Sequence, residues 1–300
     1  MDQAGKLREM IQNRIENKAE TLDSAETVPS AQKTRFICVT SGKGGVGKTN
    51  FSINLGIALC RLGKRTVVID ADLGLANVDV VAGTVPRYTL NNLLYSDMKL
   101  EDILGNGPEG LKIISGGSGM MDLLDLPQEK IQRLIFHFQE LYQLFDVAII
   151  DTGAGLSKSI LAFSGASDDI IVVTTPEPTS LTDAYAMIKA ISNEKLTTRI
   201  HIVINRAETT KEGNQYYDKI SNASEKFLGK KLEKLGTVLE DVSVSKAVKK
   251  QTPLMVEYPG SIAAKNIEVI ALRLTNENDA FDHSSMNKGG FVHRLMGIFR

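Results

Sequence analysis

The fold is decided by the stretch Ser41-Gly42-Lys43-Gly44-Gly45-Val46-Gly47-Lys48-Thr49, which Asn50 follows. It contains the spacing Gly-x4-Gly-Lys-Thr, between an apolar run at residues 36–40 and a helical pattern that continues to residue 62. Glycines let backbone N–H groups converge on phosphate oxygens, and the start of the helix adds a positive dipole. Lys48 is placed to reach the β- and γ-phosphates of a nucleotide, and the Thr49 hydroxyl to bind Mg²⁺. A glycine-rich turn without a ligand would not need this Lys-Thr pair, so we predict a nucleotide-binding loop.

Around this loop, short apolar runs alternate with helical patterns. The runs that we expect to be strands are residues 36–40, 66–70, 112–115, 147–150, 170–174, 200–204 and 236–239. Strands that are apolar on both faces and separated by helices are typical of a parallel sheet covered on two sides. We therefore predict an α/β fold over residues 35–274, a single doubly wound, mostly parallel sheet with helices on both faces.

The composition excludes several classes of protein. The chain has 300 residues, of which 42% are hydrophobic and 24% charged, values typical of a folded globular protein. A formal net charge of −1 provides no overall positive field, so strong nucleic-acid binding is not expected, and we interpret the lysines of residues 230–250 as a solvated surface. The two cysteines, Cys38 and Cys60, argue against a disulfide framework or an iron–sulfur cluster and fit a reducing cytoplasm. Because no apolar stretch reaches the roughly 20 residues that span a bilayer, we expect neither export nor a transmembrane segment.

Both ends of the chain are expected to be short amphipathic helices joined to the domain by polar linkers. The first helix spans residues 1–20 and its linker residues 21–34, and a second linker at residues 275–290 precedes the decapeptide 291–300. The apolar residues of the decapeptide fall on one side of a helical wheel: Phe291, Val292, Leu295, Met296, Ile298 and Phe299. Such a face beside arginines is typical of a helix in the interface of an anionic membrane. Docking of this helix on the domain's own core is the alternative.

The second lysine of the loop carries a resemblance. The run from Lys43 to Thr49 resembles the deviant Walker A motif of the MinD/ParA family of dimeric ATPases, and the resemblance covers residues 35–274. It implies ATP hydrolysis with ATP and Mg²⁺ as cofactors, in a homodimer whose two subunits face each other across two ATP molecules. By this resemblance Lys43 crosses the interface to the partner's phosphates and acts with Lys48 in catalysis, much as an arginine finger does.

Carboxylates follow two of the expected strands, at the edge where ligands of open α/β sheets gather. By resemblance, Asp72 is the aspartate that orients the attacking water beside the metal, although it could instead cap a turn. Asp151 resembles the Walker B residue that holds Mg²⁺ through water. Gly153 stands where many relatives have proline, which leaves the path of the backbone after Asp151 open.

Three further residues are assigned by resemblance. Asn205 and Arg206 follow the strand at residues 200–204, where the family places an asparagine against the nucleotide base. Glu208 resembles part of a guanine-reading pattern, so GTP stays open, although we favour ATP. Glu177 lies in a segment that resembles the loop approaching the partner subunit's nucleotide, or else in a turn that enters a helix.

The first residues, Asp2-Gln3-Ala4-Gly5-Lys6-Leu7-Arg8, resemble the activator motif Asp-Gln-Ala-x-x-Leu-Arg of the flagellar-number regulators within the MinD/ParA family. The resemblance implies that this helix stimulates the GTPase FlhF, with Gln3 acting at its nucleotide, and that flagellar switch-complex (C-ring) proteins are further partners. An incidental match on a frayed helix is the alternative.

Together these features predict a cytoplasmic ATPase that binds reversibly to the inner face of the cell membrane and regulates the number and placement of bacterial flagella. A MinD-type division-site ATPase would share the core and the tail but lack the activator motif, and a ParA protein would lack the membrane tail. A scaffold that binds FlhF and membrane without turning over ATP also stays open.

Overall fold

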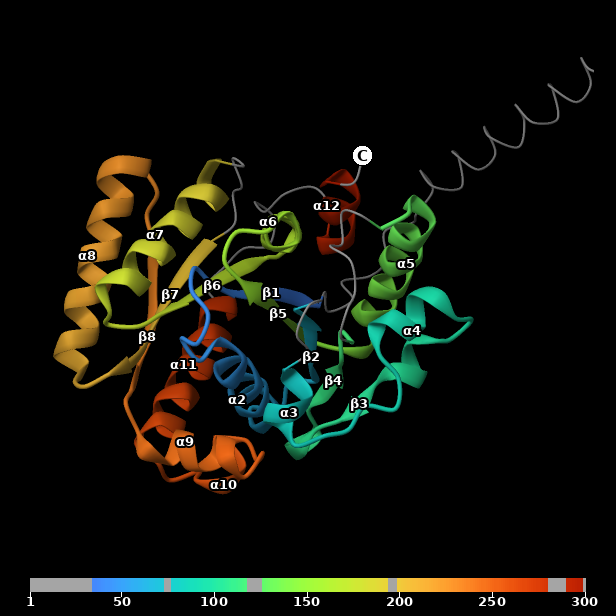
Figure 1. Cartoon of the computed structure of the whole chain (residues 1–300), viewed down its shortest axis with the longest axis horizontal. Helices are drawn as coiled ribbons and strands as arrows, with labels where there is room; N and C mark the ends of the chain where they lie inside the picture. Colours follow the sequence, from blue (N-terminus) through green and yellow to red (C-terminus); the bar gives the residue numbers. More distant parts are fainter. Residues whose placement is uncertain (1–33, 73–76, 118–125, 194–198, 280–289, 299–300) are drawn as a thin grey trace, which may run out of the picture. The chain divides into compact units, whose positions relative to one another are not determined.

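The computed structural model describes residues 34–72, 77–117, 126–193, 199–279 and 290–298 (Figure 1). The predicted activator helix with Gln3, nearly all of its linker, most of the second linker, and Phe299 lie outside these ranges. Among the described residues, no helix is both long and apolar enough to cross a membrane.

The described residues form an eight-stranded sheet in the order β3-β4-β2-β5-β1-β6-β7-β8. All neighbouring strands are parallel except β3 and β4. The strands are β1 (Arg35–Ser41), β2 (Thr66–Ala71), β3 (Gly105–Asn106), β4 (Lys112–Ile114), β5 (Val147–Ala154), β6 (Asp169–Thr174), β7 (Arg199–Ala207) and β8 (Glu233–Leu239). The predicted doubly wound fold is confirmed, and each predicted run forms a strand. The sequence did not predict β3, because two residues are too short to show an alternating pattern.

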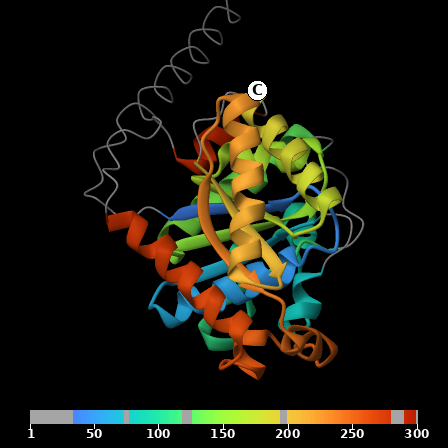
Figure 2. The ribbon, with the colours of Figure 1, turned by 90° about the vertical axis from the view of Figure 1, so that its left-hand side faces the viewer.

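Helices cover both faces of the sheet, as Figure 2 shows for α11 and α12 on opposite sides. On one face lie α2 (Lys48–Arg61), α3 (Val78–Ala82), α9 (Val242–Lys249), α10 (Leu254–Glu257) and α11 (Ile262–Asp279). On the other lie α4 (Leu90–Tyr95), α5 (Gln128–Leu144), α6 (Lys158–Ala166), α7 (Pro178–Asn193), α8 (Thr210–Leu228) and α12 (Phe291–Ile298), with the short 3₁₀ helix η1 (Leu100–Ile103). A second 3₁₀ helix, η2 (Pro108–Gly110), precedes β4. Strand residues alternate between the two cores, so Phe36 and Cys38 face one and Ile37 and Val39 the other.

The helix α11 continues through Asp279, beyond the predicted end of the domain at residue 274. Leu274 is its last described core residue, and the polar turn that follows leaves the core while the helical backbone goes on. Thr275 still bonds back to the carbonyl of Leu272. The polar composition of residues 275–279 therefore predicted a linker. In the structure these residues continue the helix beyond its last described core residue.

The C-terminal helix α12 packs on the domain, against α5 and α6 (Figure 1). Phe291 is fully buried and its ring stacks on that of Phe36, with centroids 4.0 Å apart and planes within 6°. Val292 and Leu295 are buried beside it. Arg294 ties the helix to the end of α6, donating to the carbonyl of Ala166 at 2.7 Å and pairing with Asp168 at 2.6 Å.

Docking buries part of the predicted membrane-binding face of α12 and leaves the rest exposed. Phe291, Val292 and Leu295 are buried and Met296 is partly buried, whereas Ile298 remains 40% exposed. In the described conformation the tail is docked on its own core, which is the alternative stated above, and binding of this helix to a membrane stays a prediction. The physical reason is that the groove between α5 and α6 offers the same apolar surroundings as a lipid interface.

A buried ionic cluster lies at the beginnings of the central strands. Asp169 opens β6 with no exposed surface, and its carboxylate meets Arg35 at 2.5 Å, Arg199 at 2.8 Å and His201 at 3.0 Å. Burial alone would raise the pKa of Asp169. The hydrogen bond from His201 and the guanidinium of Arg35 outweigh burial and hold that pKa well below its usual range.

Candidate functional site

The glycine-rich loop joins β1 to α2 and lines a cleft of about 880 Å³ at the carboxyl ends of the strands. Gly45 and Gly47 have φ angles of 79° and 88°, a left-handed conformation that favours glycine. Gly42 is required by space, since a Cβ atom there would lie 2.2 Å from the backbone of Asp183 in α7. These glycines let the loop wrap closely around a ligand while its backbone N–H groups stay available.

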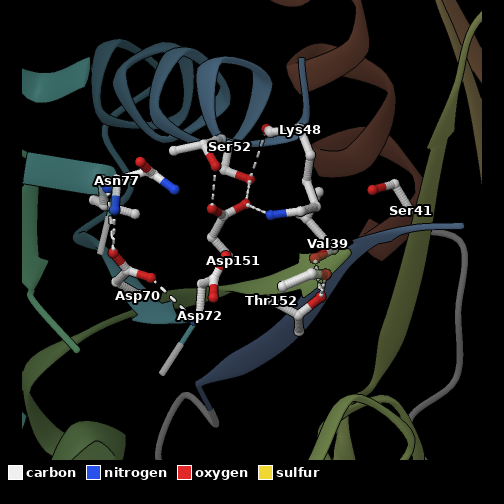
Figure 3. A network of polar contacts seen from close by, with 12 residues as sticks. Val39, Ser41, Lys48, Ser52, Asp70, Asp72, Asn77, Asp151 and Thr152 are labelled. Carbon is white, nitrogen blue, oxygen red and sulfur yellow. Dashed lines mark hydrogen bonds and ion pairs between the residues drawn. The ribbon is translucent and has the colours of Figure 1, made fainter. Parts of the chain in front are cut away.

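Asp151, near the end of β5, is the centre of a buried polar network that reaches α2 (Figure 3). Its Oδ1 atom lies 3.2 Å from Nζ of Lys48 and accepts a hydrogen bond from Oγ of Ser52 at 2.6 Å. Its Oδ2 atom accepts a hydrogen bond from Oγ1 of Thr49 at 2.7 Å. The structure thus brings together three residues that the sequence singled out, and adds Ser52, which it did not.

The residues around Asp151 fit Mg²⁺. This ion prefers hard oxygen ligands and is usually held by one or two protein groups together with water and substrate phosphates. The Thr49 hydroxyl and the Asp151 carboxylate supply such oxygens next to the glycine loop, and Lys48 supplies a positive charge for phosphate.

Two carboxylates lie at the end of β2, Asp70 within the strand and Asp72 just after it, and they have different surroundings. Asp70 is buried and accepts hydrogen bonds from the backbone N–H groups of Asp72, Asn77 and Val78, so it holds both ends of the loop that follows the strand (Figure 3). Burial first, and then the neighbouring charge of Asp151, raise the pKa of Asp70 to about 7. Asp70 therefore acts as a structural anchor for this loop.

Asp72 lines the cleft and lies against the backbone of β5 at Gly153. A Cβ atom built on Gly153 would lie 3.5 Å from Oδ1 of Asp72, which is ordinary contact. The strand continues past this glycine to Ala154, and the left-handed turn comes only at Gly155, with a φ of 84°. The backbone path after Asp151, which the sequence left open, is thus an extended strand beside Asp72, with Gly153 where many relatives have proline.

Asn205 and Arg206, at the end of β7, also line the cleft. The side-chain amide of Asn205 donates to the carbonyl of Val46 at 2.8 Å, so it supports the glycine loop directly. Arg206 has a φ of 57°, which is unusual for a side chain other than glycine and often marks a functional position. The cleft continues past these residues to the end of β8 and the start of α9, at Glu240, Asp241 and Val244.

This last region of the cleft was not predicted from the sequence. The expected strand at residues 236–239 ends there, and the rule that ligands gather at the carboxyl ends of strands could have identified it.

Lys43 and Glu177 contact each other within the same chain, and neither is among the residues that line the cleft. The Lys43 Nζ atom lies 3.2 Å from Oε2 of Glu177 and 3.2 Å from Oγ1 of Thr179. Both partners of the ion pair are open to solvent, with side chains 41% and 58% exposed. The resemblance implied that both residues face a partner subunit, and in the single chain they face each other.

Comparison with known proteins gives a consistent result. The domain family described as the CobQ/CobB/MinD/ParA nucleotide binding domain matches residues 37–254. The antiactivator FleN of Pseudomonas aeruginosa is 38% identical over 245 residues, which are 82% of this chain and 88% of FleN. The flagellum site-determining protein YlxH of Helicobacter pylori is 30% identical over 292 residues, 94% of this chain and 99% of YlxH.

Solved structures share the fold. The septum site-determining protein MinD from Pyrococcus horikoshii, solved as a complex with Mg-ADP, superposes with a TM-score of 0.67 at 24% identity and covers 82% of this chain and 98% of its own. The MinD cell division ATPase of Pyrococcus furiosus gives a TM-score of 0.66 at 24% identity, over 81% of this chain and 99% of its own.

Proposed function

Since the chain belongs to the MinD/ParA family of nucleotide-binding ATPases, in the group that contains FleN and YlxH, we propose that it is an ATP-driven dimerising switch that regulates the number and placement of bacterial flagella. The observation that carries the proposal is the convergence of Lys48, Thr49 and Asp151 beside the glycine loop, with Asp72 lining the same cleft. This is the set of groups that nucleotide hydrolysis requires.

Each group has a definite task in this reaction. Backbone N–H groups from Gly42 to Asn50 hold the phosphates, and Lys48 leaves Asp151 to contact the β- and γ-phosphates. Thr49 and Asp151 would hold Mg²⁺, which would supply positive charge beside the phosphate oxygens. Asp72, which lines the cleft, orients the attacking water and accepts its proton.

Lys43 links hydrolysis to dimer formation. Its ion pair with Glu177 is exposed, and such surface pairs contribute less than about 1 kcal/mol, so Lys43 can leave Glu177 at little cost. It then contacts the phosphates bound by the partner subunit, where a positive charge stabilises the transition state. Glu177, once released, faces the partner's nucleotide, and Asn205 and Arg206 lie toward the base.

The test of the switch compares ATP turnover, binding of a non-hydrolysable ATP analogue and oligomeric state. We expect Asp72→Ala to retain analogue binding and dimerisation and to lower turnover by about 100-fold, as removal of a general base does. Lys43→Ala is expected to retain binding and lose the dimer. Asp218→Ala, which removes an exposed carboxylate on α8, is the control. Unchanged turnover in Asp72→Ala would contradict the proposed role, and a wild-type chain without turnover would favour the scaffold alternative.

Membrane association is proposed for α12 in the dimer. One short helix binds lipid weakly, and two copies on one dimer bind with much higher avidity. We propose that dimerisation moves α12 out of its groove between α5 and α6, and that ATP hydrolysis returns it. Release would expose Phe291, Val292 and Leu295 to the anionic inner membrane.

Two variants on α12 test membrane binding without disturbing its docking. Ile298 and His293 are both exposed in the docked helix, but only Ile298 shares the apolar face. With vesicles of phosphatidylglycerol and phosphatidylcholine, we expect ATP-dependent co-sedimentation of the wild type and of His293→Glu, and its loss in Ile298→Glu. Equal sedimentation with ATP and ADP, or equal loss in both variants, would contradict the proposal.

The activator motif supports FlhF as a partner, with flagellar switch-complex proteins as further partners. Gln3 carries an amide that could orient a water at the GTPase's nucleotide. We expect a peptide of residues 1–20 to stimulate GTP hydrolysis by FlhF, and the same peptide with Gln3→Ala to fail. If neither peptide stimulates FlhF, the division-site alternative is favoured.

A further inference from the structure

Ser52 contacts the metal-binding carboxylate without being part of the cleft lining. It lies on α2 four residues after Lys48, on the same side of the helix, and has no exposed surface. Its hydroxyl lies 2.6 Å from Oδ1 of Asp151 and 3.1 Å from the backbone carbonyl of Lys48. A hydroxyl has one proton to donate, and 2.6 Å is a typical distance for an O–H to carboxylate hydrogen bond. The Ser52 hydroxyl therefore donates its hydrogen bond to Asp151.

The three contacts of Asp151 have different fates when a nucleotide binds. Lys48 and Thr49 both have ligands to bind in the proposed function, the phosphates for Lys48 and Mg²⁺ for Thr49. Ser52 has no exposed surface and its one hydroxyl proton is already donated to Asp151, so we assign it no ligand in the cleft. Of the hydrogen bonds that Asp151 accepts from side chains of α2, the one from Ser52 is therefore the one that persists.

The two oxygens of Asp151 are also distinguished. Ser52 binds Oδ1, whereas Oδ2 faces Thr49, the residue on the metal side of the network. Holding Oδ1 fixes the rotation of the carboxylate, and Oδ2 is left directed at the metal position. Without Ser52, the carboxylate would rotate once Lys48 had left it.

From this arrangement we propose that Ser52 is a positioning residue, which keeps Asp151 oriented toward Mg²⁺ while Lys48 and Thr49 engage the nucleotide. The inference rests on the proposed function of the site and adds a residue to it. Groups that orient metal-binding side chains typically contribute 10–100-fold to metal affinity. The expected effect is thus on the concentration of Mg²⁺ that the protein needs, and not on its affinity for nucleotide in the absence of metal.

The test uses a pair of variants that differ only in the hydroxyl. Ser52→Thr and Ser52→Val both add a methyl group to the buried site, so the strain that this group causes is common to both. The readout is the Mg²⁺ concentration at which binding of a fluorescent non-hydrolysable ATP analogue is half-maximal, with the same binding measured in EDTA. We expect Ser52→Val to need about tenfold more Mg²⁺ than Ser52→Thr, with equal affinities in EDTA.

Ser52→Ala provides a second measurement in case both larger variants fail to fold. Its control is Ser192→Ala in α7, because the Ser192 hydroxyl likewise bonds the carbonyl four residues earlier, at 2.7 Å, and is not among the residues that line the cleft. We expect Ser52→Ala to raise the Mg²⁺ requirement about tenfold over the wild type, and Ser192→Ala to leave it unchanged.

Equal Mg²⁺ requirements in Ser52→Val and Ser52→Thr, or in Ser52→Ala and the wild type, would overturn the inference. So would a loss of affinity in EDTA that matches the loss in Mg²⁺, because Ser52 would then support only the fold of the loop. A wild-type chain that binds the analogue independently of Mg²⁺ would instead overturn the proposed function, and this inference with it.

Discussion

One buried carboxylate, Asp169, is surrounded by polar and charged partners at the end of the sheet opposite the cleft. Asp169 has no exposed surface, and its carboxylate contacts three side chains from its two neighbouring strands, Arg35 of β1, and Arg199 and His201 of β7. A buried ion pair adds little by itself, because desolvation offsets much of the attraction. Removing one member is costly, however, since the remaining charges stay buried without a partner.

We therefore expect Asp169→Asn to lower the free energy of unfolding at pH 7 by about 3 kcal/mol, measured by urea denaturation. Asp146→Asn is the matched control, because its partner Arg65 is 53% exposed and such surface pairs contribute less than about 1 kcal/mol. Equal losses in the two variants would contradict a role for burial.

The pH dependence of Asp169→Asn follows from the direction of the pKa shift. The pKa of Asp169 is lower in the folded chain than in the unfolded chain, so its ionised form stabilises the fold above about pH 4. That contribution is lost as the pH falls below about 4 toward the folded-state pKa. The stability difference between wild type and variant should therefore shrink in this acid range, as unfolding followed by circular dichroism would show.

At the scale of elements, α12 behaves as a core helix. Phe291 joins Phe36 of β1 and Phe138 of α5 in one aromatic cluster, with ring centroids 4.0 Å and 5.8 Å from its own. The N–H group of Val292 donates to the Tyr142 hydroxyl of α5 at 3.2 Å. Burial around this hydroxyl raises the pKa of Tyr142, which therefore stays neutral in the groove. The groove and the helix thus stabilise each other through apolar and polar contacts together.

Two truncations on α12 measure this stabilisation. We expect Leu295→Ala, at a fully buried position, to lower the free energy of unfolding of the nucleotide-free chain by about 2–4 kcal/mol. Ile298→Ala, at a position 40% exposed on the same helix, should cost less than about 1 kcal/mol. Urea denaturation of both variants checks the difference, and equal small losses would show that α12 is undocked in solution.

At the scale of the whole molecule, local patterns in the sequence predicted most of the fold. The glycine loop, the apolar strands and the carboxylates that follow them are each visible within a few residues, and Asp151 and Asp72 could be placed from their strands alone. Interactions between distant segments could not be placed in this way. The bond between Ser52 and Asp151 joins positions 99 residues apart and depends on side-chain geometry, for which the sequence has no signal.

The docking of α12 shows a different limit of sequence analysis. The spacing of Phe291, Val292 and Leu295 indicates an apolar face, and a membrane or a protein groove would bury that face equally well. Only the shape of the groove between α5 and α6, set by elements more than 100 residues earlier, decides between them in the described conformation.

The stacking of Phe291 on Phe36 has a practical consequence for handling the protein. Cutting off a membrane-binding tail is a common way to make a protein easier to purify. Here, deletion of residues 291–300 would uncover Phe36, Phe138 and the apolar groove around them, and exposed patches of this kind promote self-association. Light scattering should show the shortened chain aggregating at concentrations where the full chain does not, because the docked tail covers these apolar side chains in the full chain.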